Sequence, residues 1–402
     1  MTATSPSTAP PLGNQSTPIV WLQKNLFNSW FNSILTLVLG GILAWALINL
    51  MSWAFTEALW EVIPANLPLY FAGRYPASEY WRLWLILGLI SALAGLSWGI
   101  LARNVSFLFT RGSLIVLGVL AVIGVLTPTP PLYRLLIVGL ILICAGTAWL
   151  GRELARRLPN MAQWVSLAWA LSFFVVLWLL AGGLGLDQVS ANNWGGLLLT
   201  LILSVVSTVL SFPLGVILAL GRQSSLPVVR WLSTIYIELI RGVPLIAILF
   251  MGQVMIPLFL PEGARPDRVL RAIVGLTLFT AAYLAENVRG GLQAIPRGQV
   301  EAARSLGLNA PLTMGFIVLP QALKVSIPAI VGQFISLFQD TTLVSIVGLL
   351  ELLGISRSVI SNPEFLGRHV EVYLFIGVIY WVLCYAMSIG SRKIEEKLHT
   401  GH

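Results

Sequence analysis

Charged residues are scarce in this sequence of 402 residues, since only 10% are Asp, Glu, Lys or Arg while 57% are hydrophobic. About a quarter of the residues in a soluble domain are charged, so the composition excludes a set of soluble domains. Apolar runs recur along the chain, and most approach the length of about 20 residues that a helix needs to cross a bilayer. The candidate spans are Ile34–Phe55, Leu83–Leu101, Leu114–Leu126, Leu132–Leu150, Trp164–Leu180, Leu197–Leu220, Val243–Leu260, Val269–Leu284, Ala322–Leu350 and Val372–Ile389. The sequence therefore predicts an all-α polytopic membrane protein with about ten transmembrane helices.

Cysteine and histidine are also rare. Cys144 and Cys384 each lie within an apolar run, so we expect two buried thiols and no disulfide. His369, His399 and His402 lack the spacing and the accompanying ligands of a metal site, so we expect no metal.

No loop that cradles a nucleotide phosphate is present. The motif G-x-x-x-x-G-K-[ST] does not occur, and none of the four lysines lies in one. A hydrolase-like G-x-S-x-G pattern at residues 95–99 lies inside an apolar span, with no strand before it and no plausible His and acid partners. We therefore expect neither ATP hydrolysis by this chain nor a membrane-embedded hydrolase, and no cofactor bound by the chain itself.

Basic residues outnumber acidic ones, with a net charge of +8, but they are spread thinly among loops and do not favour a nucleic-acid partner. If the N-terminus is cytoplasmic and ten spans alternate, the inside loops hold 15 Lys and Arg and the outside loops 8, leaving Arg241 aside. Cytoplasmic loops carry such an excess in membrane proteins. We therefore expect both termini in the cytoplasm.

The chain divides into four parts. Residues 1–24 are rich in Ser, Thr and Pro without a basic leader, which is typical of a disordered cytoplasmic tail. Residues 25–182 hold five additional N-terminal spans, and residues 192–392 hold five more that carry internal Gly and Pro. Membranes tolerate such irregular helices where they face protein or a cavity, so the second half is the better place for function. Residues 393–402 form a cytoplasmic tail.

The longest cytoplasmic stretch between spans is residues 286–320, which includes EAARSLGLNAPLTMGFIVLP at 301–320. Residues 301–306 favour a helix, Gly307 ends it, and Asn309 with Pro311 suits the cap and first turn of a second helix. From these residues alone, the segment could either lie on lipid headgroups or present a surface to a cytoplasmic protein.

The same segment resembles the EAA motif of ABC-importer permeases. The matching positions are Glu301, Ala302, Ala303, Gly307, Ile317, Leu319 and Pro320. Residues 237–246, 285–307 and 338–349 resemble the polar amino-acid branch of these permeases, the His, Glu, Gln, Arg and opine type. Residues 25–182 are similar to the N-terminal addition of the long M-type subunits of general L-amino-acid transporters.

The resemblance implies the permease subunit of an ATP-driven importer that moves amino acids across the bacterial inner membrane. In this family the EAA segment is a coupling helix that docks on a separate ABC ATPase, which binds the ATP and Mg. Glu301 and Arg304 would pair on one helix face or meet charges of that partner. A second permease subunit, usually a related Q-type chain, and a periplasmic solute-binding protein would complete the importer.

A candidate substrate pathway surrounds the intramembrane Asp340. It consists of Gln333, Ser336, Gln339, Asp340 and Thr341. An ionised carboxylate is costly in hydrocarbon, so Asp340 should face the bundle interior or a wet cavity, with Gln339, Thr341 or Thr342 as partners. It would accept the α-ammonium group of an amino acid, or else serve in structural or gating hydrogen bonds.

Arg241, Pro244 and Glu286 are candidates for a structural or gating role. Arg241 and Pro244 mark the point where an interfacial helix beginning near Trp231 would break before the next span. Arg241 would contact the pore or a loop, or it would snorkel and pair with Glu238. Glu286 lies near the cytoplasmic boundary.

An ion-coupled secondary amino-acid carrier is the alternative function. Such a carrier would use intramembrane carboxylates for H⁺ or Na⁺, and the core offers essentially Asp340, with Glu286 near the boundary. It would also leave the EAA segment unexplained, so we expect the ABC importer.

Overall fold

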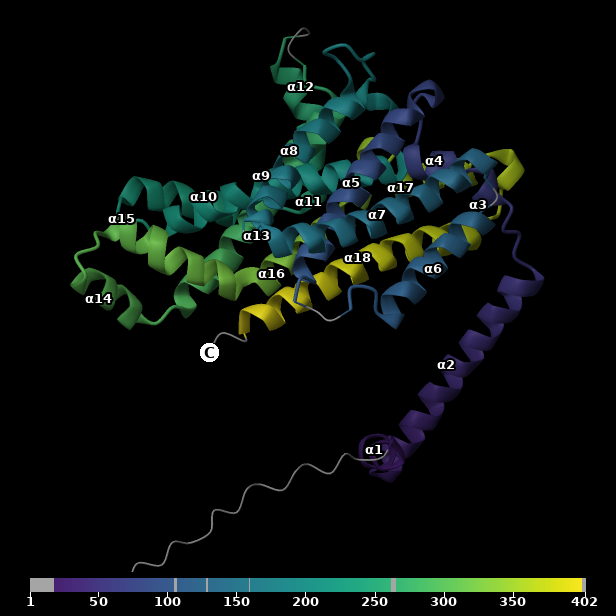
Figure 1. Ribbon diagram of the computed structural model, residues 1–402, viewed down its shortest axis with the longest axis horizontal. Helices are drawn as coiled ribbons and strands as arrows, with labels where there is room; N and C mark the ends of the chain where they lie inside the picture. The colour runs from purple at the N-terminus through teal and green to yellow at the C-terminus, as the bar shows by residue number, and fades with distance from the viewer. Residues whose placement is uncertain (1–17, 105–106, 128, 159, 262–264, 400–402) are drawn as a thin grey trace, which may run out of the picture. The chain divides into compact units, whose positions relative to one another are not determined.

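The computed structural model describes residues 18–104, 107–127, 129–158, 160–261 and 265–399, and every regular element in these ranges is helical (Figure 1). The chain divides into two compact units, Met1–Trp60 and Glu61–His402, and each is described by itself.

The described part of the first unit holds two helices, α1 (Pro18–Asn25) and α2 (Trp30–Thr56). Ser29 caps α2 by accepting a hydrogen bond from the backbone N–H of Asn32 at 3.2 Å. The predicted disordered tail, residues 1–24, lies mostly outside the described residues, but its last residues form α1. These residues form a helix because an initial Pro, which suits the first helical turn, is followed by apolar and helix-forming residues in PIVWLQKN.

The second unit begins with the remaining N-terminal helices. These are α3 (Val62–Ala65), α4 (Leu67–Ala72), α5 (Tyr80–Leu101), α6 (Arg111–Leu126), α7 (Pro131–Arg157) and α8 (Met161–Ala181). Small residues bring α5 and α7 into close contact, because a Cβ at Gly95 would overlap the carbonyl oxygen of Cys144 and one at Gly99 would overlap that of Ala148. Helix pairs in membranes commonly pack in this way, through small residues on one face.

The permease-like half follows. Its helices are α9 (Gly196–Arg222), α10 (Pro227–Gly242), α11 (Leu245–Phe250), α12 (Ile256–Phe259), α13 (Arg268–Ala294), α14 (Arg297–Ser305), α15 (Ala310–Leu312), α16 (Leu319–Asp340), α17 (Leu352–Ile360) and α18 (His369–His399). Short 3₁₀ helices are η1 (Ala77–Glu79), η2 (Ala191–Asn193), η6 (Thr341–Val347) and η7 (Pro363–Phe365), and π-helical turns are η3 (Met251–Met255) and η5 (Thr313–Val318).

Helix α13 is the centre of this half. One buried cluster joins it to α9 and α11 through Leu203, Leu249 and Leu276, and a second joins it to α9 and α16. Glycines let the backbones approach, since a Cβ at Gly215 of α9 would lie only 2.7 Å from the Cβ of Leu284. The position of α13 therefore fixes its neighbours.

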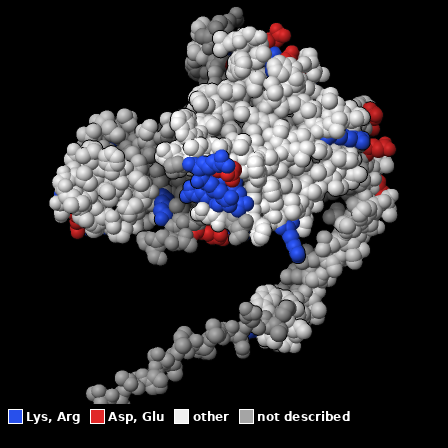
Figure 2. Space-filling model, in the orientation of Figure 1, with Lys and Arg blue, Asp and Glu red and all other residues white. Residues whose placement is uncertain are grey.

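The predicted all-α polytopic membrane protein is confirmed. Eight of the described helical runs are long and apolar enough to cross a membrane, or nine if α10 and α11–α12, which are bent by 103°, form one span. The tenth predicted run is α6, which is shorter at 16 residues. Uncharged residues cover most of the face drawn in Figure 2, as expected for a surface in contact with lipid. Helix α18 continues through His399, so most of the predicted tail 393–402 extends the last helix.

Candidate functional site

The EAA segment forms the predicted helix, turn and second helix. Helix α14 begins at Arg297 and ends at Ser305, and Gly307 then adopts φ 83°, the left-handed conformation that glycine adopts readily. The turn is closed by hydrogen bonds from the N–H of Gly307 to Arg304 O at 2.9 Å and from the N–H of Leu308 to Ala303 O at 3.1 Å. Asn309 caps the next helix by accepting from the N–H of Leu312 at 3.1 Å.

The surface of this segment combines charge with an exposed apolar tip. The side chains of Glu301, Ala302 and Arg304 are exposed, and Leu306 is 83% exposed. The proposed pairing of Glu301 with Arg304 is absent, because neither forms an ion pair within the described ranges. Both charges remain available to a partner, and an exposed apolar side chain near charged ones is compatible with a protein-binding surface.

A buried base holds this surface in place. Ala303 is buried, and Val300, Met314 and Leu319 pack against the cluster that joins α13 and α16. Gln321 donates to the carbonyl oxygen of Ile317 at 2.7 Å, and Leu319 and Pro320 form the first positions of α16. At the end of the motif, Ile317 and Leu319 are half-buried and help to anchor the loop, whereas Pro320 is exposed.

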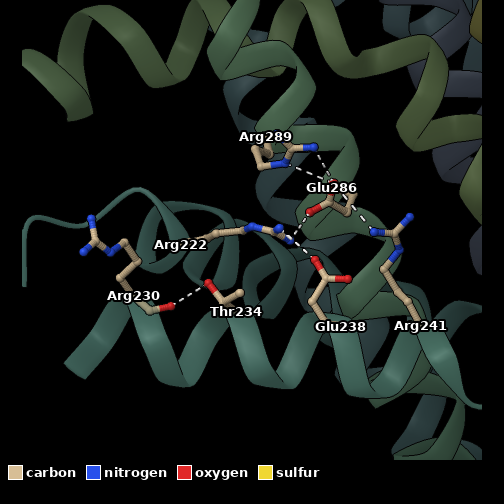
Figure 3. Close-up of polar contacts among 7 residues, drawn as sticks. All are labelled: Arg222, Arg230, Thr234, Glu238, Arg241, Glu286 and Arg289. Atoms are coloured by element: carbon tan, nitrogen blue, oxygen red, sulfur yellow. Dashed lines mark hydrogen bonds and ion pairs between the residues drawn. The ribbon is translucent and has the colours of Figure 1, made fainter. Parts of the chain in front are cut away.

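Five charged side chains form a cluster near the C-terminal end of α13, where they join α9, α10 and α13 (Figure 3). We call Arg222, Glu238, Arg241, Glu286 and Arg289 the Glu286 cluster. Arg222 at the end of α9 places Nη1 2.6 Å from Glu286 Oε1 and Nη2 2.7 Å from Glu238 Oε1 on α10. Arg289 and Arg241 lie 2.7 and 3.7 Å from Glu286 Oε2. Glu286 is thus shared by three guanidinium groups, with a side chain only 15% exposed.

The structure corrects the expected partner of Arg241. Glu238 pairs with Arg222, whereas Arg241 lies beside Glu286, and its guanidinium carbon lies 5.4 Å from the ring centroid of Tyr283. The reason is the turn after α9, which brings Arg222 alongside α10. Arg241 belongs to the last turn of α10, which begins at Pro227 and not near Trp231, and Pro244 immediately precedes α11.

Sequence reasoning missed Arg222 and Arg289 of the Glu286 cluster, and it named Glu238 only as a partner of Arg241. Arg222, Glu238 and Arg289 each lie in the last turns of a mainly apolar helix. The one indication of a functional role was that charged residues are rare in this sequence. Their pairing depends on the packing of α9, α10 and α13, which the sequence did not reveal.

The candidate pathway residues lie along the second half of α16 and at the start of η6. Ser336 and Gln339 are exposed, and Gln333 and Asp340 are half-buried. Thr341 is fully buried, and its hydroxyl donates to the carbonyl oxygen of Phe338 at 2.7 Å. The other four candidate residues are therefore at least partly accessible, whereas Thr341 is part of the packed interior.

Asp340 lacks the partners that were expected for it. Thr342 donates to the carbonyl oxygen of Gln339 at 2.8 Å, and the Gln339 amide donates to Cys384 Sγ at 3.7 Å. No hydrogen bond or ion pair reaches the Asp340 carboxylate from the residues that the structure describes. Nor do three or more His, Cys, Asp or Glu side chains gather there to hold a metal, within the same ranges. The Asp340 carboxylate is thus half-buried without a partner among the described residues.

Known proteins are similar to this chain in sequence. Residues 211–400 match the family described as binding-protein-dependent transport system inner membrane component. The inner membrane amino-acid ABC transporter permease protein YhdY of Escherichia coli (strain K12) is 39% identical over 409 residues, covering 96% of this chain and 95% of that protein. The glutamate/glutamine/aspartate/asparagine transport system permease protein BztC of Rhodobacter capsulatus is 37% identical, covering 96% of this chain and 94% of its own length. The probable glutamine ABC transporter permease protein GlnP of Bacillus subtilis is 37% identical over 205 residues, covering 51% of this chain and 92% of that protein.

These likenesses confirm the resemblance seen in the EAA motif, and they support the ABC importer over the ion-coupled carrier. Two of the relatives extend over nearly the whole chain, so the N-terminal helices are shared with them as well. The chain belongs to the family of amino-acid ABC transporter permeases, as a multi-pass protein of the inner membrane.

Proposed function

We propose that this permease is driven by a separate ABC ATPase that docks on α14 and on the turn at Gly307. The observation that carries the proposal is the exposed Leu306, which stands beside Glu301 and Arg304 on a loop with a buried base. Exposed apolar side chains on a rigid support favour a protein partner over a lipid surface, since the adjacent charges can pair across an interface. The ATPase would bind the ATP and Mg, and this chain would carry out no chemical step.

The structure offers a mechanical route from α14 to the rest of the bundle. Helix α13 is continuous from Arg268 to Ala294 and leads into α14 after two residues. A Cβ at Gly291 would overlap the carbonyl oxygen of Ala322, and Ser326 Oγ donates to the carbonyl oxygen of Asn287 at 3.0 Å. Helices α13 and α16 are therefore in direct contact next to α14, and a displacement of α14 would move both.

The Glu286 cluster extends this route to the bend between α10 and α11. Glu286 lies on α13 and contacts Arg222 of α9 and Arg241 of α10. Pro244 follows at the bend, where it has no N–H to continue the helical hydrogen bonds. We assign Arg241, Pro244 and Glu286 a gating role, in which the cluster makes α10 follow the movement of α13.

Polar amino acids are the proposed substrates. The relatives are named for amino-acid transport, and BztC for glutamate, glutamine, aspartate and asparagine. In this chain Asp340 would accept the α-ammonium group, and Gln333, Ser336 and Gln339 would supply neutral donors and acceptors for the rest of the substrate.

A second permease subunit and a periplasmic solute-binding protein would complete the importer. Gly332, Ser336 and Gln339 recur at helical spacing on one face of α16 and are exposed in the described chain, with the Gln339 amide also donating to Cys384 Sγ of α18. A second subunit, related to the Q-type chains, would cover this face and enclose the pathway.

Co-purification tests the proposed docking surface. The tagged chain, solubilised from membranes that contain its partners, is expected to retain an ABC ATPase, and Leu306→Asp is expected to lower the retained amount by about tenfold. Leu184→Asp is the matched control, since Leu184 is 94% exposed but lies in a loop remote in sequence from the motif. Equal retention by both variants would refute docking at Leu306.

A further inference from the structure

Three segments that are distant in sequence meet where α4 ends and where α9 and α17 begin. Gly73 forms an antiparallel bridge with Trp194, and Gly196 forms a parallel bridge with Glu351. The N–H of Gly196 donates to the carbonyl oxygen of Leu350 at 2.9 Å. We call residues 69–73, 194–196 and 350–352 the junction.

The backbones at the junction are too close for side chains between them. A Cβ at Gly73 would overlap Gly195, and a Cβ at Gly196 would overlap the carbonyl oxygen of Tyr70. A Cβ at Gly195 would lie 2.9 Å from the carbonyl oxygen of Leu350. Gly73 and Gly196 also have φ of 64° and 58°, which other residues rarely adopt. The N-terminal addition is therefore in backbone contact with the start of the permease core.

Side chains of the addition extend the contact to α17 and α18. Tyr70 of α4 is fully buried, and its ring lies 5.2 Å, between centroids, from that of Phe375 on α18. Val62 and Tyr70 share a buried cluster with Leu352 and Ile355 of α17. Residues of the addition thus form part of the core that holds α17 in place.

The first turn of α17 is held by other helices as well. The buried carboxylate of Glu351 accepts from the N–H groups of Leu353 and Gly354, both at 2.8 Å, and from the Tyr380 hydroxyl of α18 at 3.2 Å. The N–H of Leu352 donates to Thr200 Oγ1 of α9 at 3.1 Å. Helices α9, α17 and α18 therefore meet at the same place that α4 contacts.

A second attachment secures the loop that leads into α9. Arg82 of α5 is buried, pairs with Glu79 at 2.7 Å, and donates to the carbonyl oxygen of Asp187 at 2.8 Å. The Tyr75 hydroxyl donates to the carbonyl oxygen of Leu180 at 3.2 Å. These contacts hold the end of α8 at Leu180 and the loop between α8 and α9 at Asp187.

We propose that the part of the N-terminal addition from α3 to α5 is a brace, which holds the start of α9 and the start of α17 as one rigid body, with Gly73 and Tyr70 as positioning residues for transport. The chain passes from Asp340 through η6 directly to Glu351 and α17. The brace would therefore fix one end of the segment that carries the candidate pathway. This consequence for transport rests on the proposed function, whereas the bracing itself does not.

Hydrogen exchange of the full chain, purified with its partner subunits, tests the brace directly. Gly73→Ala is expected to raise amide exchange by about tenfold in residues 196–200 and 352–360, which are remote in sequence from the substitution. Gly183→Ala is the matched control, because Gly183 also has a positive φ of 88° but a Cβ there would have nothing within 4 Å. The control is expected to leave both segments protected.

Tyr70 provides a second test, which also serves if Gly73→Ala fails to insert. The Tyr70 hydroxyl has no hydrogen-bond partner in the described ranges, so Tyr70→Phe should retain protection of α17 while Tyr70→Ala should lose it. The variants that lose protection, Gly73→Ala and Tyr70→Ala, should also lose ATP-driven uptake. Equal protection of both segments in Gly73→Ala and Gly183→Ala, or in Tyr70→Ala and Tyr70→Phe, would overturn the brace. If the unmodified importer shows no ATP-driven uptake, the proposed function fails, and the exchange data still decide on the brace.

Discussion

Arg222 and Glu286 form an ion pair between the last residue of α9 and the interior of α13, with Nη1 2.6 Å from Oε1. The other Nη of Arg222 holds Glu238 on α10 at 2.7 Å, so one guanidinium group ties three helices together. Arg289 and Arg241 also pair with Glu286, and among the described residues neither forms an ion pair with another carboxylate. Removing the Glu286 carboxylate would therefore break three ion pairs at once, more than the loss of any one arginine would break.

Glu286→Gln is expected to uncouple the importer. The amide removes the negative charge that three guanidinium groups share, so their repulsion would loosen α10 from α9 and α13. We expect uptake to fall by about tenfold or more while the complex still assembles and hydrolyses ATP. The measurement is uptake per ATP hydrolysed in proteoliposomes.

The matched control for this variant is Glu153→Gln. Glu153 lies 2.6 Å from Arg157, but the two side chains are 37% and 73% exposed, so the pair contributes less than about 1 kcal/mol. Uptake by the control should remain at the level of the unmodified chain. Unchanged coupling in Glu286→Gln would show that the cluster is not part of the transmission route.

Gly307→Asp is expected to insert normally and to transport poorly. A Cβ at Gly307 would have nothing within 4 Å, so the cost arises from φ 83°, which is worth about 1 kcal/mol for a residue other than glycine. The strained turn would displace Leu306 from the docking surface, and ATP hydrolysis would be less well coupled to uptake. Gly183→Asp, at an equally open position with a similar φ of 88° in the loop between α8 and α9, should preserve coupling. Normal uptake by a stably inserted Gly307→Asp variant would rule out this role of the turn.

Asp340→Asn is expected to reduce uptake without reducing the amount of inserted protein. The two side chains have nearly the same shape, but the amide cannot stabilise an α-ammonium group by charge. We expect uptake at low substrate concentration to fall by about tenfold, with membrane levels measured in parallel by immunoblot. Full activity of this variant would remove Asp340 from the substrate pathway.

Glu351 should make the stability of the chain depend on pH. Burial raises the pKa of this carboxyl from 4.5 to about 7, although the N–H groups of Leu353 and Gly354, Tyr380 and the charge of Arg357 oppose the rise. Because the folded state binds the proton more tightly, the stabilisation is fully present below about pH 4.5 and is lost as the pH rises through about 7.

The thermal midpoint of the unmodified protein in detergent should therefore fall between about pH 5 and about pH 8 by roughly 2–4 °C more than that of Glu351→Gln. The variant keeps the shape of the side chain but has no proton to lose in this range. Glu364→Gln, a change at an exposed position, should behave like the unmodified protein. An identical pH dependence in all three proteins would show that Glu351 does not titrate as described.

The sequence was sufficient where local chemistry decides the structure. Long apolar runs give helices because every backbone polar group must be satisfied within the membrane, and all ten predicted runs are helical. Gly307 and Asn309 fixed the turn of the EAA segment because their conformational preferences are intrinsic to the residues. The family could be predicted from the same local motif.

Contacts between distant residues were not predictable in the same way. Of the two alternatives for Arg241, the pairing with Glu238 was wrong, because its partner depends on how α9, α10 and α13 pack. Glu351 received no role, because nothing in its neighbouring sequence indicates that Tyr380 and Gly196 lie beside it. Buried polar groups of this kind become visible only once the helices are placed.

ATP dependence of uptake is the most direct test of the account. The chain would be purified with its partner subunits, reconstituted in proteoliposomes, and supplied with binding protein and a radiolabelled polar amino acid. We predict accumulation only when ATP is present on the side of the ATPase, with no loss when an uncoupler removes the ion gradients. Accumulation that requires a H⁺ or Na⁺ gradient and proceeds without ATP would contradict it.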